Sequence, residues 1–185
     1  MEQKMRKLNL LSALIFSLCS FSAFAQEFKP GYYGIAVAGP TTETLGKVKL
    51  GGNGYQIGGG YEFNKNAALE VTYGNAIKIE TATSASSVTY NMTSLFINGV
   101  FRFPVNESFI PLVTFGRVSG TESIAVTGTG TASSASATGA RTVYGAGFEI
   151  PLEARTSFRL NTQSTTSRTN YATIKSTTAG LIYKF

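Results

Sequence analysis

The chain ends in Ala179-Gly180-Leu181-Ile182-Tyr183-Lys184-Phe185, and these seven residues are the clearest indication of its fold class. Successive side chains on a β-strand point to opposite faces, so Leu181, Tyr183 and Phe185 share one face. A strand that closes a barrel in lipid needs such an apolar and aromatic face, because its outer side meets hydrocarbon and the membrane interface. The ending therefore predicts a β-barrel that spans a membrane.

The other end of the chain has the pattern of a cleaved export signal. A positively charged start is followed by an apolar run from Leu8 to Leu18, which is shorter than a membrane-spanning helix requires. Ala23 and Ala25 are small residues at the two positions that a signal peptidase reads, which predicts cleavage directly after Ala25. We therefore expect a signal peptide over residues 1–25 and one β-barrel domain over residues 26–185.

The composition argues against several kinds of chemistry. The chain has no histidine, and its single cysteine, Cys19, lies in the predicted signal. It therefore lacks the commonest general base and metal ligand, and its mature part lacks a thiol nucleophile. The mature part carries thirteen cations and nine anions, a net charge of +4 that is spread along the chain rather than gathered into a nucleic-acid patch. We expect no enzyme, no cofactor, no metal site and no nucleic-acid partner.

Segments of alternating apolar and polar residues follow the signal at even spacing, separated by clusters of glycine, proline, asparagine, serine and threonine. Short turns and long connections alternate between them. The predicted long loops are Gly39 to Asn53, Asn75 to Ser87, Gly120 to Arg141 and Gln163 to Asn170. Short turns at one end and long loops at the other are typical of outer-membrane barrels. The predicted fold is all-β, an eight-stranded antiparallel up-and-down transmembrane β-barrel.

Two details of these segments stay open. The register of the fifth strand is not determined, because Leu112 and Val113 are adjacent and both apolar. The stretch from Gly120 to Arg141 is small, polar and nearly uncharged. It is either a flexible loop or an extension of the fifth and sixth strands as a hairpin above the membrane.

Aromatic residues gather near both ends of the predicted strands, as expected for the interfacial girdles of a membrane barrel. The group near the short turns comprises Tyr33, Tyr61, Phe63, Phe101, Phe103, Phe109, Tyr183 and Phe185. The group near the long loops comprises Tyr55, Tyr73, Tyr90, Tyr144 and Tyr171. A soluble sandwich would scatter its aromatic residues along the middles of its strands instead.

Charged side chains occupy the strand faces that point into the predicted barrel. They are Glu62, Glu70, Arg102, Glu149, Arg159 and Lys184. The interior of an eight-stranded barrel is just wide enough for its own side chains, and a buried charge left unpaired costs several kcal/mol. Three carboxylates and three cations therefore predict a polar network of salt bridges in the lumen. The network is either a plug that holds the barrel together or a polar path for ions or small solutes.

Four stretches, Gly58 to Phe63, Ala68 to Gly74, Asn98 to Phe103 and Gly180 to Phe185, resemble the small outer-membrane β-barrel family of the OmpA and OmpX types. These are fold motifs, so the resemblance implies topology and a membrane rather than an activity. It also implies that Leu181, Tyr183 and Phe185 form an assembly signal. Such a signal is read by the barrel-assembly machinery, with periplasmic chaperones acting during biogenesis.

These features together predict a monomer in the outer membrane of a Gram-negative cell, in contact with outer-membrane lipids. The expected role is structural, in envelope integrity or in contact with an unidentified extracellular partner through the long loops. Two alternatives stay open. One is a narrow pore for ions or small solutes, and the other is a soluble periplasmic ligand binder of lipocalin-like shape.

Overall fold

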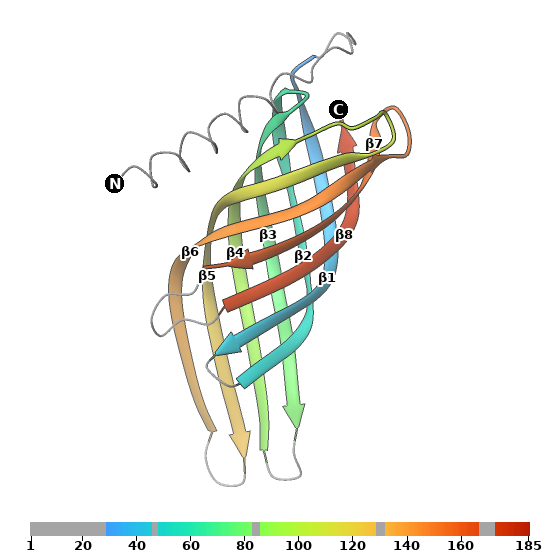
Figure 1. Ribbon diagram of the computed structural model, residues 1–185. Coiled ribbons are helices and arrows are strands. Elements are labelled where there is room, and N and C mark those ends of the chain that lie inside the picture. Colours follow the sequence, from blue (N-terminus) through green and yellow to red (C-terminus); the bar gives the residue numbers. More distant parts are fainter. Residues whose placement is uncertain (1–28, 46–47, 83–85, 129–131, 167–172) are drawn as a thin grey trace, which may run out of the picture.

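The protein forms a closed barrel of eight β-strands, seen in a computed structural model that describes residues 29–45, 48–82, 86–128, 132–166 and 173–185 (Figure 1). The strands are β1 (Gly31–Leu45), β2 (Val48–Asn64), β3 (Ala67–Ala82), β4 (Ser86–Arg102), β5 (Ile110–Gly128), β6 (Ala132–Pro151), β7 (Thr156–Thr165) and β8 (Thr173–Lys184). Each strand pairs antiparallel with its neighbours in sequence, and β1 pairs with β8 to close the barrel. The predicted up-and-down topology is confirmed.

The N-terminal prediction cannot be compared with the fold. The predicted signal peptide, with Ala23 and Ala25, lies outside the described residues. Within the residues that are described, no helix is both long enough and apolar enough to cross a membrane.

Side chains alternate between the outer and inner faces of the wall, as the period of a strand requires. On β4, Leu95 and Ile97 are 42% and 48% exposed on the outside, whereas Asn98 is 1% exposed on the inside. On β5, Leu112 is buried inside and Val113 is exposed outside, which fixes the register that the sequence leaves open. The outer wall at this level is therefore apolar, and buried polar side chains such as Asn98 face the lumen.

Tyr33 does not belong to the aromatic girdle in which the sequence placed it. It is 1% exposed and points into the lumen, on the same face as Ile35 and Val37. The outer face of β1 instead carries Tyr32 followed by glycine and alanine residues, and Tyr32 packs against Tyr61 with ring centroids 4.9 Å apart. Glycine and alanine are apolar enough for an outer wall, so the bulkier face of β1 is free to fill the interior.

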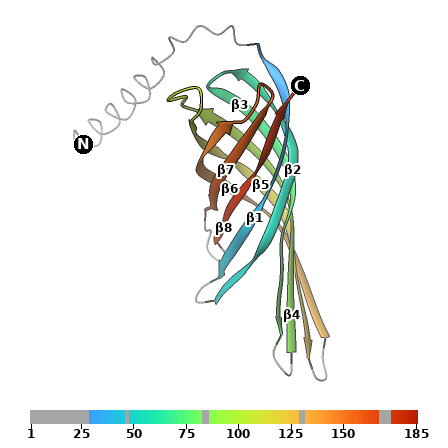
Figure 2. The ribbon, with the colours of Figure 1, turned by 90° about the vertical axis from the view of Figure 1, so that its right-hand side faces the viewer.

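The predicted long loops Gly39 to Asn53 and Asn75 to Ser87 are largely strand among the described residues, which corrects the sequence interpretation, whereas Gln163 to Asn170 is strand only as far as Thr165 and its residues 167–170 lie outside the described part. Figure 1 and Figure 2 show β3, β4, β5 and β6 continuing well beyond the other strands at the end opposite the C-terminus. The last pair between β2 and β3 at this end is Gly54 with Ala76, and the last between β6 and β7 is Val143 with Thr165. Beyond these points β3 to β6 form an open sheet. Strands that extend into water can pair through their backbones without an apolar outer face. The backbone pairing of β3 to β6 therefore continues beyond the point where the apolar pattern stops.

The stretch from Gly120 to Arg141 forms part of this sheet as a hairpin. Residues Gly120 to Thr127 of β5 pair in register with Ala132 to Gly139 of β6. Of the two possibilities that the sequence left open, the structure shows the strand extension for the described part of this segment.

Candidate functional site in the barrel lumen

The six charged residues predicted for the lumen lie together at its short-turn end. One half of this ion-pair network is built around Arg102, which is 3% exposed at the end of β4. Its Nε atom lies 3.0 Å from an oxygen of Glu149, and its Nη1 atom lies 3.1 Å from Glu62. The same Glu62 also forms an ion pair with Lys184, whose Nζ atom lies 3.0 Å from a carboxylate oxygen of Glu62. Lys184 is the most solvent-exposed member, with 41% of its side chain accessible.

The other half of the ion-pair network is built around Arg159, which is 1% exposed on β7. Its Nη1 atom lies 2.5 Å from Glu70 on β3, across the lumen. Its Nη2 and Nε atoms lie 2.7 and 3.0 Å from the same oxygen of Glu149 on β6. Glu149 is therefore shared by Arg159 and Arg102, and it joins the two halves.

Tyr33 completes the ion-pair network, and its place there was not predicted from the sequence. Its hydroxyl donates a hydrogen bond to Glu70 at 3.0 Å, and Arg102 lies 5.5 Å from the centre of its ring, within range of a cation–π interaction. With Tyr33 included, the network takes residues from β1, β2, β3, β4, β6, β7 and β8. It therefore connects strands that do not pair with each other in the wall.

Apolar side chains from β1, β3, β4, β5 and β8 lie beside these charges. They are Ile35, Val37, Ala68, Val100, Leu112 and Ile182, and with Tyr33 they form one buried cluster. Such a setting excludes water and strengthens each ion pair, but it also raises the cost of leaving any charge without its partner. The network therefore stabilises the barrel only if each of its charges keeps its partner.

A second layer of the lumen lies next to the charges and consists of Asn98, Thr114 and Asn161, which we call the polar belt. All three are at most 4% exposed. Each stands opposite an inward glycine on the neighbouring strand: Asn98 pairs with Gly116, Thr114 with Gly145 and Asn161 with Gly147. A side chain in place of Gly116 would collide with Asn98 and with the backbone of β4. The glycines therefore leave room for the belt to lie against the wall.

The polar belt has hydrogen-bonding atoms without partners among the described residues. They are both side-chain atoms of Asn98, the hydroxyl of Thr114 and the carbonyl oxygen of Asn161. Ser94 has the same arrangement, with its hydroxyl unpaired and Gly120 opposite. Buried polar groups without partners cost about 1–3 kcal/mol each. The middle of the lumen is therefore the part where the described residues leave the most hydrogen-bonding groups of neutral side chains unpaired.

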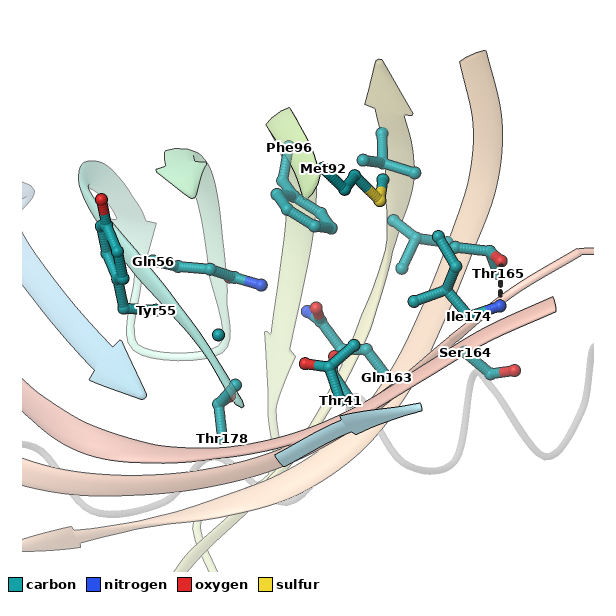
Figure 3. Close-up of a pocket in the computed structure, with 14 residues that line it drawn as sticks. Thr41, Tyr55, Gln56, Met92, Phe96, Gln163, Ser164, Thr165, Ile174 and Thr178 are labelled. Atoms are coloured by element: carbon teal, nitrogen blue, oxygen red, sulfur yellow. Dashed lines mark hydrogen bonds between the residues drawn. The ribbon is translucent and has the colours of Figure 1, made fainter. Parts of the chain in front are cut away.

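A third layer, towards the extended strands, has an apolar cluster on one side and buried polar side chains on the other. Met92, Phe96, Val118, Val143 and Ile174 form one buried cluster, which we call the apolar constriction. Figure 3 shows Gln56 and Thr41 facing this cluster across a narrow space. The cavity between them measures about 20 Å³, room for one or two water molecules. The backbone amide of Ile174 donates a hydrogen bond to the hydroxyl of Thr165 at 3.0 Å, which fixes the beginning of β8 beside the cavity.

An ion pair lies beyond the apolar constriction, where the barrel opens into the extended sheet. Arg141 of β6 bonds Glu122 of β5 there. Both residues belong to the stretch from Gly120 to Arg141, for which the sequence leaves a loop and a strand extension open. No group of three or more histidine, cysteine, aspartate or glutamate side chains suited to a metal ion occurs among the described residues.

Comparison with known proteins identifies the family. The model of the outer membrane protein β-barrel domain matches residues 11–185. No curated protein matches the chain. Among solved structures, Neisserial surface protein A (NspA) has a TM-score of 0.69 at 16% identity, covering 85% of this chain and 99% of NspA.

Two further solved structures resemble the chain. Ail, the attachment invasion locus protein of Yersinia pestis, has a TM-score of 0.62 at 17% identity and covers 84% of this chain and 99% of its own. The N-terminal β-barrel domain of Pseudomonas aeruginosa OprF has a TM-score of 0.51 at 13% identity, with 85% and 100% covered. These likenesses support the fold. Because the family model spans nearly the whole chain, this protein belongs to the outer membrane protein β-barrel family and resides in the outer membrane.

Proposed function

We propose that this protein is a closed, non-catalytic barrel that reinforces the outer membrane and presents its extended strands to the outside of the cell. The observation that carries the proposal is the ion-pair network with Tyr33, because it draws on seven of the eight strands and crosses the lumen. Side chains that brace a barrel are unavailable for chemistry. Glu62 and Glu70, the acidic pair that a catalytic reading would use, are both bound to arginine.

The extended sheet of β3 to β6 supports the surface part of the proposal. Its tips project beyond the apolar wall, and the described residues Ser133 to Thr138 are all exposed. We place the extracellular partner, whose chemistry the sequence does not specify, on this sheet. The described part of the chain would act as a monomer in contact with outer-membrane lipids.

The C-terminal aromatic residues support a role in assembly. Leu181, Tyr183 and Phe185 are 52%, 46% and 78% exposed on the outer wall, and the rings of Tyr183 and Phe185 lie 5.6 Å apart. These side chains are accessible on β8, the last strand, before it pairs with β1 and closes the barrel. We propose that these three residues are the signal that the barrel-assembly machinery reads.

The rival function is a narrow pore, and the unpaired atoms of the polar belt favour it. The second rival, a soluble periplasmic binder, does not fit a chain of the outer-membrane family with an apolar outer wall. Single-channel recording on protein purified from outer membranes separates the closed barrel from the pore. We expect no resolved conductance from the wild-type protein. Reproducible steps that disappear on Glu70→Gln or Arg102→Gln would contradict the closed barrel.

A further inference from the structure

We propose that β6 is the edge through which this protein pairs with a second copy of itself in an opposing membrane. The contact is made by residues 132–140, which lie in the part of β6 that extends beyond the barrel. The inference rests on the proposed surface role of the extended sheet, and it adds which strand makes the contact and which partner fits it. Within its own membrane the barrel stays a monomer.

The extended sheet has two edges, formed by β6 on one side and β3 on the other (Figure 1). Over residues 132–140, β6 pairs with β5 on one side, and no described strand pairs with its other side. Ser133 to Thr138 are exposed. An edge of this kind presents a row of unpaired N–H and C=O groups to which another strand can bond.

The register shows which backbone groups point to the free side of β6. The carbonyl oxygen of Thr142 accepts a hydrogen bond from the backbone amide of Thr166, so it points away from β5. The N–H and C=O groups of every second residue of a strand point to the same side, and the pairing of β6 with β5 has no register shift. Ser134, Ser136 and Thr138 therefore direct their N–H and C=O groups to the free side.

The two edges of the extended sheet differ in their protection against pairing. Charged residues and bulges are common means by which proteins prevent an edge strand from pairing with another chain. The extended part of β3 contains Lys78 and Glu80, and its register with β4 shifts between Ala76 and Ile79. Residues 132–140 of β6 are only alanine, serine, threonine and glycine. The sheet is therefore protected along β3 and open along β6.

A second copy of β6 is complementary to this open edge. In an antiparallel pair with a twofold axis at Ser136, Ser134 of one copy lies opposite Thr138 of the other, so residues with free backbone groups meet each other. Like charges directly opposite each other would destabilise such a pair, and residues 132–140 contain no charge.

The direction of the strands places the two copies in opposing membranes. The extended strands run away from the barrel at the end opposite the C-terminus (Figure 2). The strands of an antiparallel pair run in opposite directions, so the two barrels lie at opposite ends of the contact. A contact through one strand edge is small and weak, but many copies on two facing membranes bind together by avidity.

Clustering of lipid vesicles tests the proposal. Protein purified from outer membranes is inserted into preformed phosphatidylcholine vesicles, where the polar extended strands stay outside because an open sheet edge does not cross hydrocarbon. Ser136→Pro removes the N–H at the centre of the contact and keeps the pairing with β5. We expect wild-type vesicles to cluster in light scattering, and Ser136→Pro to slow clustering at least about tenfold. Ser136→Ala keeps this N–H and is the matched control, expected to cluster like the wild type.

Two charged variants keep the test decisive if Ser136→Pro does not fold. Position 136 of one copy faces position 136 of the other, so vesicles with Ser136→Lys or with Ser136→Glu should stay dispersed alone and cluster when mixed. Ser123→Lys and Ser123→Glu are the controls, because Ser123 lies opposite Ser136 on β5, between two strands, and both should cluster alone. Dispersed wild-type vesicles, or a folded Ser136→Pro or Ser136→Lys variant that clusters like the wild type, would overturn the proposal.

Labelling of Ser136→Cys on intact cells separates this inference from the proposed function. A maleimide too large to cross the outer membrane reaches the thiol only if the extended sheet faces outside, and the parent chain reports any label on Cys19. Labelled cells together with dispersed wild-type vesicles would overturn the self-pairing and leave the surface role standing, with the edge open to a strand of another protein. Unlabelled cells would overturn both.

Discussion

Replacing Arg159 with methionine is expected to lower the free energy of unfolding by about 3–5 kcal/mol. Arg159 is buried and binds both Glu70, at 2.5 Å, and Glu149, at 2.7 Å. Its loss leaves Glu70 with only the hydroxyl of Tyr33, and a buried carboxylate without a cation is among the costliest defects that a single substitution can create. Urea unfolding of the protein in lipid vesicles, followed by the heat-modifiable gel shift of the folded barrel, measures the change.

Two variants control for loss of charge as such. Lys184→Met removes a cation from the same network, but its side chain is 41% exposed, and exposed ion pairs are worth at most about 1 kcal/mol. Adding Glu70→Gln to Arg159→Met removes the orphaned charge and should restore part of the stability. Equal and small losses for Arg159→Met and Lys184→Met would mean that the ion-pair network does not brace the barrel.

Arginine at position 71 should also destabilise the barrel strongly, by about 2–4 kcal/mol if Val71 lies near the bilayer midplane. Val71 is 42% exposed on the outer wall of β3, between the buried side chains of Glu70 and Thr72. A cation there faces hydrocarbon with no partner. The free energy of unfolding in vesicles of defined lipid thickness measures the cost.

A depth series makes this prediction specific to a membrane. Towards the extended end of β4, Leu95 is the last apolar residue on the outer face, and the polar Thr93 follows it. Leu95→Arg should therefore cost less free energy of unfolding than Val71→Arg. Asn91 is exposed still further along β4, and Asn91→Arg should cost about 0–1 kcal/mol, as expected near the interface. A cost that does not decrease in this order would mean that the outer wall is not the surface in contact with lipid.

The faces of the strands could be predicted from sequence because alternation reports the environment of each side directly. A charged residue on a strand whose other face is apolar must point into the lumen, so the members of the ion-pair network could be predicted from the alternation of residues along each strand. Which of these charges pair with each other could not be predicted in this way. Arg159 and Glu70 are 89 residues apart, and their contact depends on the stagger of every strand between them.

Tyr33 and the apolar constriction were missed for the same physical reason. Both are apolar or aromatic groups on inner faces, where alternation predicts polar ones. A signal was present, because Phe96 shares its parity with Asn98 and Arg102, and Tyr33 shares its parity with Ile35. Space inside a barrel is filled by whichever side chains fit, so the lumen tolerates apolar residues more readily than lipid tolerates charges. Parity alone is therefore a safer guide than hydrophobicity on inner faces.

The extended strands were predicted as loops, or left open between loop and hairpin for Gly120 to Arg141, because the apolar pattern ends at the membrane boundary. The residues there, such as Ser133 to Thr138 of β6, have no period-two contrast, since both faces of that sheet meet water. The backbone hydrogen bonds hold it together with a few polar side-chain contacts, such as that between Thr121 and Thr138, and such pairing does not require an apolar residue pattern. The structure thus adds to the sequence mainly where a strand has water on both sides.

Oxygen accessibility of spin labels along β4 tests the central claim, that the barrel is apolar outside and polar inside. The chain beyond Cys19 contains no cysteine, so single cysteines can be placed at each position from Leu95 to Phe101 in turn. Molecular oxygen concentrates in lipid, and we predict fast relaxation at Leu95, Ile97 and Phe101 and protection at Asn98. Protection at Leu95, Ile97 and Phe101, with labels immobilised as in a dry core, would contradict the account.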